Sequence, residues 1–74
     1  MSSYGVVLVH TTSAAMRAER VLLRSGLSVK LIPTPRQFST DCGIAVRFAW
    51  ADAELVASLL AANRVEVSGI ERLP

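Results

Sequence analysis

The first half of the chain shows three segments of regular hydrophobic patterning. Residues 4–10 are apolar and β-branched on both faces, which is typical of a central strand buried on both sides. Residues 13–24 place apolar side chains on one helical face and arginines on another, and Gly26 is suited to end that helix. Residues 27–32 alternate between apolar and polar positions, which predicts a half-exposed strand at a sheet edge.

The second half repeats the pattern in the order strand, helix, strand. Residues 44–48 alternate, with Ala45 and Arg47 expected on the outer face. A second helix is predicted to begin at residues 51–52 and to end at Asn63 in a left-handed conformation. Residues 65–70 form the last predicted strand, with a bulge at Gly69. The apolar stripe expected on the second helix comprises Leu55, Val56, Leu59 and Leu60.

The order β-α-β-β-α-β predicts an α+β fold of the ferredoxin-like type over a single domain, residues 1–74. Each helix has only one apolar stripe, so both helices should cover the same face of a four-stranded antiparallel sheet. Right-handed crossovers then give the strand order 4-1-3-2.

This topology brings three distant segments to one end of the sheet. The end of strand 4–10, the start of helix 13–24 and the loop 33–43 should meet there. The loop is longer than a hairpin requires, and long loops in small domains often carry function. Pro33 and Pro35 should hold its first residues extended. The residues expected to become neighbours are His10, Thr11, Thr12, Ser13, Arg36 and Cys42.

Cys42 is the single cysteine of the chain, and Gly43 after it leaves room for a reactant to approach the sulfur. A helix N-terminus or a nearby cation stabilises a thiolate, and the topology offers the helix start near Thr12 and Ser13, and also Arg36. Such a thiolate can attack a sulfane sulfur or an activated selenium species and carry the atom as a persulfide or selenosulfide.

A purely structural interpretation accounts for the same residues. A free cysteine is often a small buried hydrophobe, and Thr12 and Ser13 can serve simply as helix caps. His10 is either a base for the thiol or a partly exposed side chain at a strand end. Asp41 beside the cysteine opposes thiolate formation, and Arg36 can equally be a solvated loop charge.

Composition narrows the classes of function further. The 74 residues are 51% hydrophobic and 19% charged, which excludes a disordered chain. One cysteine and one histidine exclude an internal disulfide and argue against zinc, and we expect no metal ion and no cofactor. The net charge is only +2, with scattered arginines and no aromatic ladder, so we expect no nucleic-acid partner.

The apolar run near the N-terminus bears on location. It comprises four valine and leucine residues, too few for a signal segment or a membrane span. We therefore expect no membrane association and a cytoplasmic location, where a lone cysteine stays reduced.

Three stretches resemble a known family. They are Ser13 followed by AAMRAERVL, then VKLIPTPRQFSTDCG with its Pro-x-Pro-Arg and Ser-x-x-Cys-Gly patterns, then IAVRF. These residues resemble the putative selenium/sulfur carrier protein-like family, a family of small bacterial domains of unknown function. The resemblance implies that Cys42 carries sulfur or selenium and that the chain associates with selenium-metabolism or persulfide-transfer proteins. The positions that match the motif are Pro33, Pro35, Arg36, Cys42, Gly43 and Arg47.

Two hypotheses of function follow. In the first, the chain is a carrier and not an enzyme, and its partners are sulfur or selenium donor and acceptor proteins. In the second, it is an interaction or regulatory module whose open sheet face binds a second copy, a larger subunit or a small ligand. Depending on register, that face would present Val7, Val9, Lys30, Ala45 and Arg47. An acid–base enzyme is disfavoured because the carboxylates are dispersed.

Overall fold

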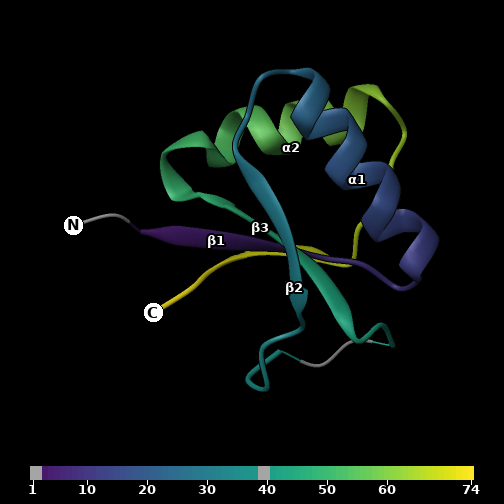
Figure 1. Cartoon of the computed structure of the whole chain (residues 1–74), viewed down its shortest axis with the longest axis vertical. Coiled ribbons are helices and arrows are strands. Elements are labelled where there is room, and N and C mark those ends of the chain that lie inside the picture. Colours follow the sequence, from purple (N-terminus) through teal and green to yellow (C-terminus); the bar gives the residue numbers. More distant parts are fainter. Residues whose placement is uncertain (1–2, 39–40) are drawn as a thin grey trace.

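The fold is built on one four-stranded sheet with two helices on one side of it (Figure 1). A computed structural model describes residues 3–38 and 41–74. Its elements in chain order are β1 (Tyr4–Leu8), α1 (Thr12–Arg24), β2 (Val29–Pro33), β3 (Ile44–Ala49), the short 3-10 helix η1 (Trp50–Asp52), α2 (Ala53–Ala62) and β4 (Gly69–Arg72).

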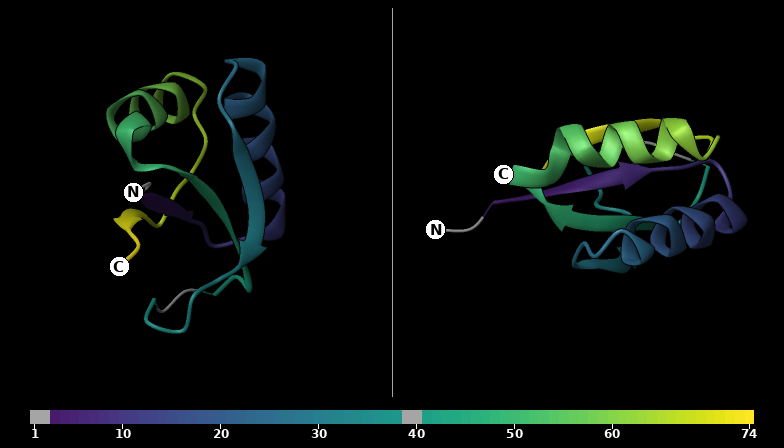
Figure 2. Two further views of the ribbon diagram at one scale, coloured as in Figure 1. Left: turned by 60° about the vertical axis from the view of Figure 1, so that its left-hand side comes forward. Right: turned by 90° about the horizontal axis from the view of Figure 1, so that it is seen from above.

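The topology of the sheet confirms the predicted ferredoxin-like arrangement. The spatial order is β2-β3-β1-β4, which is the predicted order 4-1-3-2 read in reverse. All neighbouring strands are antiparallel, and Val7 of β1 lies opposite both Val46 of β3 and Ile70 of β4. Figures 1 and 2 show α1 and α2 together over the same face, as two helices with one apolar stripe each require.

The main core lies between this face and the helices. Val46 and Phe48 project into it from β3, and the expected inward positions of that strand are thereby confirmed. The fully buried helical contributions are Ala15, Ala18 and Leu22 from α1 and Val56 and Leu60 from α2. The prediction that Leu55 belongs to the core is wrong, because Leu55 is 47% exposed. Val56 and Leu60 form the buried side of α2, and Leu55 lies outside it.

The residue predicted to end α1 is confirmed, whereas the left-handed residue predicted at the end of α2 is not. Gly26 stands just beyond α1 at φ +84°, and the amide of Leu27 donates to the carbonyl of Leu22, so Gly26 ends the helix as predicted. At α2 the left-handed residue is Arg64, at φ 54°, and not Asn63. The Asn63 amide side chain instead donates to the carbonyl of Leu59 at 2.8 Å, within the last turn.

All four strands differ in extent from the prediction. β1 ends at residue 8 instead of 10, β2 spans 29–33 instead of 27–32, β3 ends at residue 49 instead of 48, and β4 spans 69–72 instead of 65–70. Val65 does not join β4, because its amide donates to the carbonyl of Leu60 and so takes part in the C-terminal cap of α2. The bulge expected at Gly69 is absent, since Gly69 pairs with Leu8 in continuous register with the following residues.

The residues of β1 that face away from the helices are not the ones expected. The pairing of Val6 with Arg47 places the even-numbered residues of β1 outward, so Val7 and Val9 belong to the helix-facing core. The assignment of Ala45 to this outer face is confirmed, yet Ala45 is fully buried there. It forms a second, smaller cluster with Val6 and Leu8, against which Ile32, Phe38 and Leu73 pack.

Gly5 permits a close approach of two aromatic rings to β1. The rings of Phe48 and Trp50 stack with centroids 6.0 Å apart. A Cβ at Gly5 would lie 2.5 Å from a carbon of the Trp50 ring and 2.6 Å from one of Phe48. A side chain at this position would therefore displace the aromatic pair at the end of the core.

Candidate functional site

Cys42 is held where the loop after β2 returns to the sheet. The amide of Thr34 donates to the carbonyl of Gly43 at 3.0 Å, and the Thr34 hydroxyl donates to the carbonyl of Cys42 at 2.9 Å. These bonds continue the pairing of β2 and β3 beyond Pro33 and Ile44, where the register of the two strands ends. The backbone of Cys42 is thereby fixed against the edge of the sheet.

The sulfur of Cys42 faces the first turn of α1. Its Sγ lies 4.0 Å from Oγ1 of Thr12, the first residue of that helix. The Cys42 residue is 6% exposed and packs within the helix-facing core. In Figure 1 the start of α1 lies above the last residues of the loop that leads into β3, so the predicted meeting of these segments is seen directly.

The first turn of α1 gives this end of the site a partial positive charge. Thr11 caps the helix, because its hydroxyl accepts a hydrogen bond from the amide of Ala14 at 3.1 Å. No acidic residue lies in the first turn to offset the helix dipole. A sulfur that becomes anionic beside Thr12 is therefore placed where the helix attracts negative charge.

His10 contacts the loop through its neighbour, not through the cysteine itself. Nδ1 of His10 lies 3.4 Å from a carboxylate oxygen of Asp41, with side chains 50% and 84% exposed. An ion pair this exposed contributes about 1 kcal/mol or less. The contact ties the end of β1 to the residue before Cys42. The role of His10 as a base for the thiol stays a prediction.

The remaining residues singled out in the sequence lie in the loop after β2 and in the first turn of α1. Pro33 is the last residue of β2, and the carbonyl of Pro35 accepts from the amide of Phe38, so Arg36 lies exposed in a turn. Within the described residues no hydrogen bond or ion pair joins Arg36 to Cys42. Ser13 is exposed in the first turn of α1, which begins one residue earlier than predicted. The motif's Ser39 lies outside the described residues.

Gly43 leaves open space beside the cysteine. A Cβ built on Gly43 would meet nothing within 4 Å, and its φ is not in the left-handed region. Next to it lies a shallow apolar pocket of about 240 Å³, lined by Leu31, Ile32, Pro33, Gly43 and Ile44. Gly43 borders this pocket, whereas the sulfur of Cys42, the preceding residue, faces Thr12 of α1.

Thr34 is a residue of the site that the sequence analysis did not identify. It lies between the two prolines, where the expectation was an extended break in the strand. Once residue 33 pairs with residue 44, antiparallel register places Thr34 opposite Gly43. A threonine at that position can reach the neighbouring carbonyl, so the pairing register was the signal that would have found it.

In the ranges 3–38 and 41–74, histidine, cysteine and acidic residues form no group of three or more that could hold a metal ion. In the same ranges no helix is long and apolar enough to cross a membrane.

Comparison with known proteins adds one finding. A family model described as "Putative Se/S carrier protein-like" matches residues 4–72, nearly the whole chain. No curated protein and no solved structure matches the chain.

Proposed function

The chain belongs to the "Putative Se/S carrier protein-like" family, and on that premise we propose that it carries one sulfur or selenium atom on Cys42 and passes it between partner proteins. The observation that supports this proposal most directly is the position of the single cysteine, with its sulfur 4.0 Å from the first residue of α1. The other candidate thiol chemistry, a disulfide within the chain, needs a second cysteine that the sequence does not have.

Loading of Cys42 is an exchange that needs no external oxidant or reductant. The Cys42 thiolate attacks the terminal sulfur of a donor persulfide, R–S–SH, and a new sulfur–sulfur bond forms while the donor's own sulfur–sulfur bond breaks. The donor leaves as the thiol R–SH, and Cys42 becomes the persulfide. With a selenium atom in the terminal position, the same exchange gives the selenosulfide.

Delivery reverses the exchange. An acceptor thiolate attacks the outer atom, the bond to Cys42 breaks, and Cys42 departs as a thiolate beside the N-terminus of α1, which stabilises the negative charge. The cycle returns Cys42 to its starting state, and its only net result is the transfer of one atom from the donor to the acceptor. We therefore propose a carrier, not an enzyme with a turnover reaction of its own.

The burial of Cys42 gives the carrier a means of protecting its cargo. A persulfide on a surface thiol is open to attack by any small thiol, whereas Cys42 is 6% exposed. We propose that a donor or acceptor protein docks at Gly43 and the adjoining apolar pocket, next to Cys42 in the chain, and reaches the atom when this end of the loop opens. We propose a cytoplasmic setting, in which the cysteine remains reduced between cycles.

The proposal is tested by loading the chain with a small persulfide donor and measuring the intact mass over time. The matched control is the double variant Cys42→Ser with Ser58→Cys, which moves the only thiol to an exposed position on α2. We expect Cys42 to gain one sulfur atom and to lose it to glutathione more slowly than the control thiol. Loss at equal rates from both chains would contradict the proposed role of burial, and failure of Cys42 to load would contradict the carrier function.

A further inference from the structure

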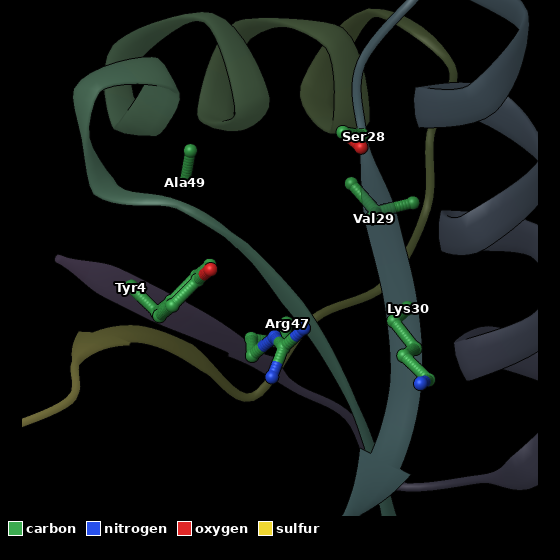
Figure 3. Close-up of a pocket in the computed structure, with 6 residues that line it drawn as sticks. All are labelled: Tyr4, Ser28, Val29, Lys30, Arg47 and Ala49. Carbon is green, nitrogen blue, oxygen red and sulfur yellow. The ribbon is translucent and has the colours of Figure 1, made fainter. Parts of the chain in front are cut away.

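A second pocket lies on the outer face of the sheet, at the end opposite to Cys42. Its volume is about 360 Å³, and Figure 3 shows the residues that line it. Those residues are Tyr4, Ser28, Val29, Lys30, Arg47 and Ala49. Arg47 is the lining residue of β3 nearest to Cys42 along the chain, and the five residue steps between their positions span about 17 Å along an extended strand.

Two cations share this pocket without a compensating carboxylate. Lys30 of β2 lies directly opposite Arg47 of β3. Like charges in directly opposite positions destabilise an antiparallel pair. None of the described residues that line the pocket is acidic. Glu71 is on the same face but pairs with Val6 on the far side of β1, and no ion pair joins it to Arg47 within the described residues. An anion bound between Lys30 and Arg47 would relieve this repulsion.

Arg47 is held in an orientation suited to bind such an anion. Its guanidinium carbon lies 4.4 Å from the centre of the Tyr4 ring, as in a cation–π contact. The N–H groups of a guanidinium point outward in its own plane, so stacking on a ring leaves them available. No hydrogen bond or ion pair engages them among the residues that the structure describes.

We propose that this pocket binds a small organic molecule that carries a carboxylate or phosphate group. Arg47 forms a bidentate pair with two oxygens of that group, and Lys30 adds a second charge. Ser28 and Tyr4 line the same pocket, and their hydroxyls supply further donors, while Ala49 supplies apolar wall. The volume lies at the lower end of the range for small-molecule sites, which fits a small metabolite. The pocket thus assigns the chain a ligand site that is separate from the carrier cysteine.

The experiment is a titration of the isotopically labelled chain followed by amide NMR, with inorganic phosphate and succinate as separate probes at constant ionic strength. We expect saturable shifts confined to residues around Tyr4, Lys30 and Arg47. Arg47→Gln should weaken affinity at least about tenfold, because it removes a charged, bidentate pair. The control Arg24→Gln removes the same charge from the exposed end of α1 and should leave affinity unchanged. Saturation by phosphate alone or by succinate alone identifies which group the pocket prefers.

Two further variants test the ligand site independently of Arg47→Gln. Lys30 is exposed, so Lys30→Gln should retain the fold and still lower the affinity even if Arg47→Gln proves unstable. Cys42→Ser should bind both probes as the parent chain does, which separates this site from the carrier function. Shifts that rise linearly without saturation, or that spread over all the arginines, would overturn the proposal, as would unchanged affinity in the Lys30→Gln chain.

Discussion

The hydrogen bond from the Thr34 hydroxyl to the carbonyl of Cys42 offers a direct way to change access to the cysteine. Thr34→Val keeps the size and β-branching of the side chain and removes only the donor. A hydrogen bond of this kind contributes about 0.5–1.5 kcal/mol net. The bond forms only while residues 34 and 42 lie side by side, so its loss should favour local opening of this pairing by that amount.

The expected effect on reactivity follows from that free energy. A shift of about 0.5–1.5 kcal/mol raises the open population about 2-fold to about 12-fold. Cys42 is 6% exposed, so a reagent reaches its sulfur chiefly through the open state. The alkylation rate of Cys42 in Thr34→Val should therefore rise by the same factor.

The assay is alkylation by iodoacetamide and by a bulkier maleimide, each followed by intact mass, in which a single cysteine gives a single adduct. Ser13→Ala serves as the control, because it removes an exposed hydroxyl at the same end of the molecule without touching the loop bond. Equal rates for Thr34→Val and the parent chain with both reagents would show that Cys42 reacts from the closed state. That result would refute the reasoning from burial.

Three further predictions concern glycines and the helix cap. Gly43→Ala should change stability by less than about 0.5 kcal/mol in urea unfolding, because its Cβ meets nothing within 4 Å, yet it should slow maleimide alkylation of Cys42. Gly5→Ala should lower the free energy of unfolding by about 1–3 kcal/mol, since its Cβ would fall 2.5 Å from Trp50; an unchanged urea midpoint would disprove the clash. Thr11→Ala should cost about 1 kcal/mol in thermal unfolding, whereas Thr11→Ser should restore the cap.

Strand order and helix placement could be predicted because they depend on features present in the sequence pattern. Each helix has one apolar stripe, and handed crossovers leave one arrangement for four strands. The face of each β1 residue could not be assigned, because the strand is apolar at every position from Val6 to Val9 and alternation gives no signal. The packing of Phe38 and Leu73 against the cluster of Val6, Leu8 and Ala45 was equally unpredictable, since both lie outside regular elements.

In the candidate site, too, the placement set by topology could be predicted, whereas the local contacts could not. The approach of Cys42 to the start of α1 follows from topology, which sequence order alone determines. The Thr34 bond depends on where β2 pairing stops, which differs from the predicted strand by one residue at that end. The side-chain position of Arg36 depends on the turn at Pro35 that places it in solvent, and no periodic pattern extends through that loop.

The measurement that tests the carrier function most directly is the intact mass of the chain isolated from its own cells. The cells are grown with and without selenite, and the chain is purified under anaerobic conditions without reductant. The account predicts a population with one additional sulfur or selenium atom on Cys42, removed by dithiothreitol and absent from Cys42→Ser. An unmodified thiol in every preparation, while other protein persulfides in the same extract survive, would contradict it.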